Sequence, residues 1–450
     1  MYDINLPYCK VAFVKKNSTL FDVSTTFGTR LLVLVGNFIV SIITARLLGP
    51  EGKGLYAAIS VIPGLVLAFS DFGIGHSAAY LVGRKIHRQE DIASSLLLLW
   101  ILTSIFAVCV AAIFYAFQFG SEYWLLLLIM LLVIPCDLGI RYMKGFLQGK
   151  ERISAMNKLD VYRVLLNIAC TLLLVAGLRM GVMGMVLTTF TISLAACILS
   201  TFYAGKEVRL KLRILKPISM QLFSRGIAFA AAILILQLNL RIDLVMLESM
   251  STIYEVGIYS LGTNVSELIW QIPTAVGMVL FARSANSKTA NEAVQRTARM
   301  IRMLVPVLFV FGIVFWGIMP IFVNLLYGKA YSDSIPVIRL LLPGIILMVI
   351  VKLLHSDLSG RGKPLLSMLL AIPSLIVNVA ANWYLIPRYG AEGAAISSSI
   401  SYSLACFLFI IVYAYSERIS LRELLMIRGA DISDIRRQIR KPGLVRKSTG

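Results

Sequence analysis

Residues 132–149 read LVIPCDLGIRYMKGFLQG, and residues 340–360 read LLLPGIILMVIVKLLHSDLSG. Each stretch places a proline, a lysine and a glycine in the same order inside an apolar run. The matching residues lie about 210 positions apart, which indicates an internal repeat. The two stretches are therefore predicted to be the same helix in two similar halves of one chain.

The repeat extends beyond these two stretches. Asn167 recurs as Asn378, and Gly181 and Gly184 recur as Gly390 and Gly393. Residues 53–56 (KGLY) and 256–259 (VGIY) form a further echo at a slightly shorter offset. In a membrane protein, two halves with six spans each share one orientation and can rock against each other around a site at their interface.

The composition indicates a membrane protein, since 58% of the 450 residues are hydrophobic and only 15% are charged. A helix needs about 20 apolar residues to cross a bilayer. We predict an all-α polytopic fold of twelve transmembrane helices in two six-helix lobes, related by a pseudo-two-fold axis along the membrane normal. The predicted spans are residues 25–48, 55–82, 93–117, 124–147, 157–178, 182–204, 226–247, 255–281, 303–324, 335–354, 365–386 and 393–415.

The net charge of +20 could indicate a nucleic-acid partner, but the basic residues gather on alternate loops. That distribution is the one that membrane insertion requires, with the basic loops on the cytoplasmic side. It predicts no nucleic-acid partner and two cytoplasmic termini. The predicted segments are a cytoplasmic N-terminal stretch (1–24), two lobes (25–204 and 218–416), a basic linker (205–217) and a basic tail (417–450) that contacts anionic lipid head groups.

Three arginines fall in predicted spans without an acidic residue that could face them on the same helix. Arg30 and Arg46 lie on the first span and Arg241 lies on the seventh. Each could extend its head group to the membrane interface. Alternatively, they could form a cationic cavity wall, because a guanidinium stays charged and binds phosphate oxygens through a planar fork.

Buried acids are the second unusual feature of the spans. Asp71 and Glu267 lie midway along equivalent helices, and Asp243 lies beside Arg241. Carboxylates at this depth are either paired with a buried arginine or serve proton or cation coupling. Two other pairs, Asp137 with Arg141 and Asp160 with Arg163, have the spacing for neutralisation on one helix face.

The chain has no nucleophile elbow, P-loop or metal motif. Its six cysteines are scattered singly, and its three histidines have no partner at metal-ligand spacing. We therefore predict no enzymatic activity, no cofactor, no metal and no disulfide.

Several segments resemble the polysaccharide transporter family of the multidrug/oligosaccharidyl-lipid/polysaccharide flippase superfamily. They are residues 45–56 (ARLLGPEGKGLY) with 71–73 (DFG) and 79–80 (AY), residues 241–243 (RID) with 257–259 (GIY), and residues 389–396 (YGAEGAAI). The resemblance implies a V-shaped pair of lobes around a cationic cavity. It also implies transport of undecaprenyl-diphosphate-linked oligosaccharide units across the bacterial cytoplasmic membrane for O-antigen, capsule or exopolysaccharide biosynthesis.

On this resemblance Arg46 and Arg241, which lie in matched motifs, would hold the diphosphate, whereas Arg30 is a candidate by location alone. Alternating access would be driven by an ion gradient or by membrane potential, with Asp71, Glu267 and Asp243 as candidates for coupling. A polysaccharide polymerase and assembly proteins are possible partners. A multidrug exporter of the same superfamily and a membrane-embedded polymerase or ligase are the alternatives.

Overall fold

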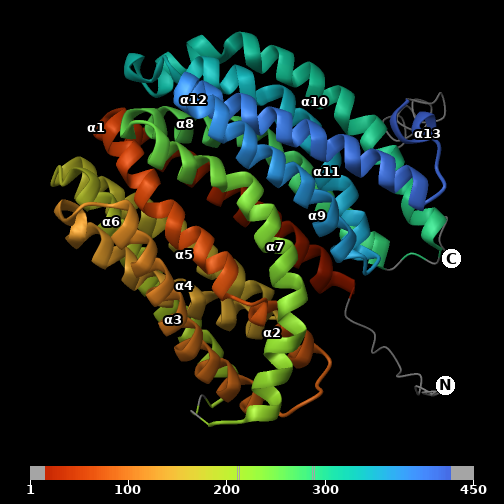
Figure 1. Ribbon diagram of the computed structural model, residues 1–450. Helices are drawn as coiled ribbons and strands as arrows, with labels where there is room; N and C mark the ends of the chain where they lie inside the picture. Colours follow the sequence, from red (N-terminus) through yellow and green to blue (C-terminus); the bar gives the residue numbers. More distant parts are fainter. Residues whose placement is uncertain (1–15, 210, 212, 286, 288, 427–450) are drawn as a thin grey trace.

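The computed structural model describes residues 16–209, 211, 213–285, 287 and 289–426, and all regular structure within these residues is helical (Figure 1). The N-terminal elements are α1 (Lys16–Ser70), α2 (Ile74–Gly83), α3 (Gln89–Gln118), η1 (Ser121–Tyr123), α4 (Trp124–Gly149), α5 (Ile153–Cys170), the π-helix η2 (Thr171–Gly177) and α6 (Gly181–Glu207). The C-terminal elements are α7 (Lys216–Met250), α8 (Ile253–Ser266), η3 (Glu267–Trp270), α9 (Gln271–Ala285), α10 (Ala290–Leu326), η4 (Lys329–Tyr331), α11 (Ser334–Gly360), α12 (Pro364–Ser416) and α13 (Leu421–Leu425).

Eight helical segments in the described residues are long and apolar enough to cross a membrane, against the twelve predicted from the sequence. The difference arises partly because α1 and α12 each contain more than one predicted span. Both helices are broken internally by a glycine with non-helical backbone angles, Gly49 in α1 and Gly390 in α12. The other predicted spans without a counterpart lie in α7 and in the region where η3 separates α8 from α9.

The repeated glycines share one backbone conformation. Gly181, which begins α6, has φ of 56°, and its repeat partner Gly390 has φ of 52°. A positive φ of this size is strained for residues that carry a Cβ, so glycine is favoured at both turns. The internal repeat of the sequence thus extends to the geometry of the backbone.

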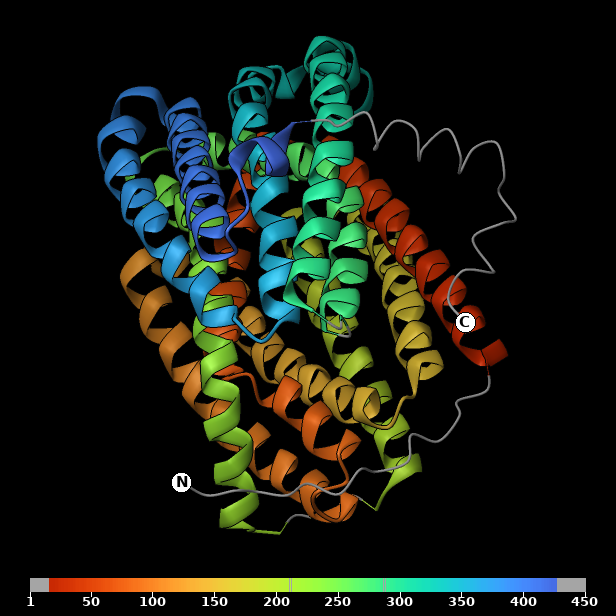
Figure 2. The same cartoon turned by 90° about the vertical axis from the view of Figure 1, so that its right-hand side faces the viewer.

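The N-terminal and C-terminal helices gather on different sides of the molecule. Figures 1 and 2 show α2–α6 grouped apart from α10–α12, with α1, α7 and α8 between the two groups. Helix α1 packs against α5 of the first group and against α7 and α8, and α7 packs against both α12 and α2. The interface between the two groups is therefore built mainly from α1, α7 and α8.

Two glycine pairs let segments from the N-terminal and C-terminal halves of the chain touch backbone to backbone. A Cβ on Gly54 of α1 would overlap the carbonyl oxygen of Ile253, and a Cβ on Gly257 of α8 would overlap the carbonyl oxygen of Pro50. Gly73, before α2, and Gly226 of α7 approach each other in the same way. Small residues at helix crossings in membranes allow such close contact.

The five cysteines within the described residues are all free thiols, and Cys9 lies outside those residues.

Candidate functional site

A continuous cavity lies at the interface of the two helix groups. One chamber, here the Lys53 chamber, has a volume of about 640 Å³, and a second, here the Arg30 chamber, has a volume of about 800 Å³. The two chambers share Asn37 and Ser41 of α1 and Asn264 of α8 as lining residues. They are therefore parts of one space bounded by both halves of the chain.

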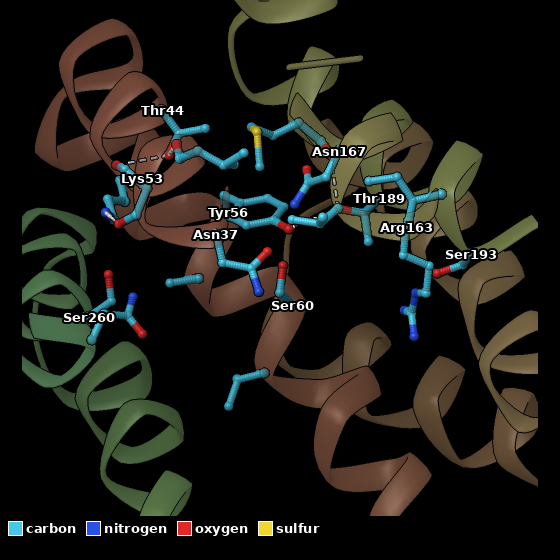
Figure 3. A pocket seen from close by; sticks show the side chains of 18 of the residues that line it. Asn37, Thr44, Lys53, Tyr56, Ser60, Arg163, Asn167, Thr189, Ser193 and Ser260 are labelled. Carbon is cyan, nitrogen blue, oxygen red and sulfur yellow. Dashed lines mark hydrogen bonds between the residues drawn. The ribbon is translucent and has the colours of Figure 1, made fainter. Parts of the chain in front are cut away.

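The walls of the Lys53 chamber are rich in hydroxyl and amide groups. Figure 3 shows Asn37, Tyr56 and Ser60 of α1 between Ser260 of α8 on one side and Ser193 of α6 on the other. The Tyr56 hydroxyl lies 2.8 Å from the hydroxyl of Thr189, which links α1 to α6 across the chamber. Such a lining suits a hydrated ligand that forms many hydrogen bonds better than it suits an apolar one.

Arg30 and Arg241 both line this cavity. The Arg30 side chain is exposed in the Arg30 chamber and forms no hydrogen bond or ion pair with the residues that the structure describes. Arg241 lines the Lys53 chamber from α7, and its Nη2 lies 3.1 Å from Oε2 of Glu267. Arg241, which has no acidic residue to face on its own helix, thus pairs with Glu267 of another predicted span.

Arg46 lies outside the lining of both chambers. Its Nε donates a hydrogen bond of 2.7 Å to the carbonyl oxygen of Leu326, and its Nη2 donates to the carbonyl oxygen of Leu325. These carbonyls end α10, so the guanidinium binds a helix C-terminus. Arg46 therefore does not line the cavity with Arg30 and Arg241, the other two arginines predicted to hold the diphosphate.

The buried acids Asp71 and Asp243 lie in different surroundings. Asp71 has one oxygen 3.8 Å from Nη1 of Arg141, and its buried Oδ1 has no hydrogen-bond partner among the described residues. Asp243 accepts hydrogen bonds from the hydroxyl of Tyr259, from the hydroxyl of Ser398 at 2.8 Å and from the backbone N–H of Leu244 at 2.9 Å. Neither acid lines the two chambers.

The ion pairs predicted within single helices are replaced by pairs between helices. Arg141 of α4 faces Asp71, and Arg163 of α5 lies 3.6 Å from Asp137 of α4. Asp160 pairs with Lys144 of α4. The prediction was wrong because the spacing of two residues along one helix carries no information about a closer charge on the neighbouring helix.

Lys53 is a cavity residue that lies between the predicted spans 25–48 and 55–82. Gly49 divides α1 into a first arm and a second arm. The Lys53 side chain is buried at the start of the second arm, and only 7% of the residue is exposed. The chain re-enters the helix directly after Gly49, so no loop separates Lys53 from the packed interface. The glycines on both sides of Lys53 could have indicated its burial, since glycines at the start of a helix often mark close packing against another helix.

Within the described ranges, no three His, Cys, Asp or Glu side chains lie close enough together to hold a metal ion.

Comparisons of the sequence identify relatives that act in surface polysaccharide synthesis. The family described as "Polysaccharide biosynthesis protein" matches residues 22–288. A Shigella flexneri protein named "Putative O-antigen transporter" is 22% identical over 79% of this chain and 88% of its own length. The capsular polysaccharide biosynthesis protein CapF of Staphylococcus aureus is 21% identical over 86% of this chain and 97% of its own.

Solved structures with the same fold come from two groups of transporters. The lipid II flippase MurJ in an inward closed conformation superposes with a TM-score of 0.70 at 14% identity, covering 95% of this chain and all of that one. A multidrug resistance MATE family transporter in an inward-facing conformation gives a TM-score of 0.69 at 15% identity, covering 86% and 94% of the two chains. The chain therefore has the all-α, multi-pass fold of the MATE and MurJ transporters.

Proposed function

Because the chain belongs to the polysaccharide biosynthesis protein family, whose members are membrane transporters and not enzymes, we propose that it is a flippase for undecaprenyl-diphosphate-linked oligosaccharide units. It would act in the cytoplasmic membrane of a bacterium and supply units for a surface polysaccharide. A polysaccharide polymerase and assembly proteins would use the product.

The observation that carries this proposal is a polar cavity with cationic groups between the two halves of the chain. A diphosphate is recognised by guanidinium groups, which bind its oxygens through charge-assisted hydrogen bonds. Arg30 offers such a group and forms no ion pair in the described residues, while Glu151 and Asp160 line the same chamber. Arg241 shares its charge with Glu267. The hydroxyls and amides of the Lys53 chamber would bind sugar, while the polyprenyl tail would stay in the bilayer.

The proposed transport path requires twelve crossings arranged as two lobes. We assign two crossings to each of α1 and α12, on either side of Gly49 and Gly390, and one each to α7 and to the α8–α9 segment. The lobes would be residues 25–204 and 218–416, joined by the linker 205–217. Residues 1–24 and 417–450 would lie in the cytoplasm.

Energy for alternating access would come from an ion that binds acidic groups inside a lobe. Asp243 has hydroxyl groups of Tyr259 and Ser398 around it, and on α12 the buried amides of Asn378 and Asn382 each retain an atom without a partner in the described part of the chain. Oxygen-rich surroundings of this kind suit a proton or a hard cation. Asp71 and Glu267, each beside an arginine, are the other candidates for coupling.

The test is transport of a fluorescent polyprenyl-diphosphate oligosaccharide in proteoliposomes. Replacing Arg30 with alanine should lower the rate about tenfold or more, because one charge-assisted contact to the diphosphate is lost. The melting temperature should stay unchanged, since Arg30 is exposed and without a partner among the described residues. Arg388→Ala is the matched control: Arg388 is also exposed but packs on Tyr384, outside both chambers.

Arg241 requires a double substitution, because alanine alone would leave Glu267 as a buried charge without its partner. In the Arg241→Ala/Glu267→Gln protein, a tenfold slower transport at normal folding would support the proposed site. Normal transport by both this protein and Arg30→Ala would refute the cationic-cavity mechanism. A wild-type protein that does not transport the lipid-linked oligosaccharide but exports drugs would refute the proposed flippase function itself.

A further inference from the structure

We propose that the oligosaccharide carried by this protein is acidic and that Lys53 recognises a carboxylate on one of its sugars. This inference rests on the proposed function and specifies its substrate class.

Lys53 is a buried cation without an acidic partner in the described part of the chain. Its Nζ donates a hydrogen bond of 3.3 Å to the hydroxyl of Ser41, and it forms no ion pair there. Burial of an ammonium group is costly unless an opposite charge compensates it. The other cations of the Lys53 chamber differ in this respect, since Arg163 is paired with Asp137 and Arg241 with Glu267.

Two aromatic rings lie near the ammonium. The Nζ atom lies 5.5 Å from the ring centroid of Tyr327 and 6.0 Å from that of Tyr331, within the range of cation–π attraction. These rings partly offset the desolvation of the charge but do not neutralise it. Lys53, Ser41 and Asn37 all line the chamber that a ligand would enter, and Figure 3 labels Lys53 and Asn37.

The cavity therefore holds two cations without acidic partners among the described residues, Arg30 and Lys53, and they lie far apart. Arg30 is on the first arm of α1 well before the Gly49 break, and Lys53 is just after it. The Lys53 ammonium, however, lies beside Ser41, eleven residues after Arg30. At a rise of about 1.5 Å per residue, these two positions on the first arm are roughly 17 Å apart. A single diphosphate cannot reach both cations at once.

A substrate that satisfies both cations must carry two separated anionic groups. In a lipid-linked oligosaccharide, one is the diphosphate and the other must belong to the sugars. The lining of the Lys53 chamber includes neutral hydroxyl and amide groups, such as those of Ser41 and Asn37, which suit a sugar ring whose single acidic substituent meets the ammonium. The two acids of this lining, Asp137 and Asp160, are paired with Arg163 and Lys144. A carboxylate fits this position because an ammonium binds it through a charge-assisted hydrogen bond.

The experiment compares two substrates that differ by one group. Proteoliposomes receive a polyprenyl-diphosphate oligosaccharide containing a uronic acid, or the same molecule with that carboxylate reduced to a primary alcohol. Wild-type protein should transport the acidic substrate faster. Lys53→Gln should lower the acidic-to-neutral rate ratio about tenfold, the effect of losing one charge-assisted contact.

Lys53→Arg should retain most of the ratio, since it keeps the charge, and Lys158→Gln should retain all of it, since Lys158 is exposed and lines neither chamber. Melting temperatures of the variants establish that each is folded. Equal slowing of both substrates by Lys53→Gln would overturn the inference and assign Lys53 to a group that both share, such as the diphosphate. An unchanged ratio would also overturn it. A wild-type protein that moves neither substrate would refute the proposed function and this inference with it.

Discussion

Arg46 and Arg30 lie on the same arm of α1, yet their side chains meet different chemistry. The Arg46 guanidinium donates to the carbonyl oxygens of Leu325 and Leu326, the last two residues of α10. Carbonyls in the last turn of a helix have no partner within the helix and carry its negative dipole end. Arg46 is therefore suited to join α1 to α10, and Arg30 to meet a ligand.

Replacing Arg46 with alanine should lower the melting temperature by roughly 2–4 °C, the shift expected for a loss of about 1–2 kcal/mol in a large chain. Lys should recover only part of the loss, because an ammonium cannot present two N–H groups in a fixed fork. Differential scanning fluorimetry in detergent measures both variants. A normal melting temperature with transport lost would instead assign Arg46 to the substrate, as the sequence motif suggested.

The contacts of single side chains were the hardest feature to predict from the sequence. The sequence singled out Arg30 and Arg241 as cavity candidates, and both line the chambers. That they hold a diphosphate stays a prediction. The sequence did not identify Lys53 as a cavity residue, and it paired Asp137 with the wrong arginine, because both depend on which helix lies next to α1 or α4. Spacing along the chain predicts the face of a helix but does not identify the neighbour of that face.

At the scale of elements, the crossing of α1 and α8 depends on one glycine from each half. Gly54 and Gly257 belong to the repeated KGLY and VGIY stretches, and their backbones touch. A methyl group at either position would overlap a carbonyl oxygen of the opposite helix. The contact is therefore possible only when both residues lack a side chain.

Gly54→Ala should force α1 and α8 apart and open the Lys53 chamber toward the turn around Gly49. A cysteine introduced at Ser60, in a protein without other cysteines, should then react faster with a membrane-impermeant maleimide added on that side. Gly64→Ala is the matched control, since Gly64 lies in the same helix and a Cβ there would meet no atom within 4 Å. Equal labelling of the two variants would show that the crossing does not close the chamber.

For the whole molecule, the same ionic contact recurs in both halves. Glu207, at the end of α6, lies 2.7 Å from Nε of Arg152 and 3.7 Å from Nζ of Lys150. Glu417, at the end of α12, lies 2.7 Å from Nη1 of Arg361 and 3.0 Å from Nζ of Lys363. Each glutamate ties the last long helix of its half to the turn after the repeated glycine, Gly149 or Gly360, and thereby holds the half together.

Protonation of Glu417 should weaken the second of these contacts. Burial acts to raise the pKa of Glu417, but hydrogen bonds from Arg361 and Lys363 and their charges outweigh that effect and lower the pKa. A carboxyl group with a lowered pKa stabilises the fold at neutral pH and loses this contribution as the pH falls through the lowered pKa. Glu417→Gln should therefore melt below wild type at pH 7, and the difference should shrink in acid.

The control for this pH series is Glu292→Gln, which breaks a half-exposed pair with Arg296 on the surface of α10 and should change the melting temperature little at any pH. A difference between wild type and Glu417→Gln that stays constant from neutral to acidic pH would contradict the role of the ionised carboxylate.

The organisation of the molecule was largely predictable because it is encoded in repeated positions. The pair Gly181 and Gly390 marked equivalent turns, and the structure gives both the same positive φ. The all-α membrane fold followed from apolar length alone. The number of crossings stays a prediction, because α1 and α12, which each contain two predicted spans, turn at one glycine.

The single-residue turn at Gly49 divides α1 into two helical arms, one before and one after the glycine. The first arm carries Asn37 and Ser41 on the wall of both chambers, and the second carries Gly54 against α8. The two arms are joined by one residue and not by a loop. We therefore expect a ligand that displaces one arm to tilt the other. Occupancy of the cavity and closure of the α1–α8 crossing are thereby mechanically linked, and the linkage needs no contact between the ligand and α8.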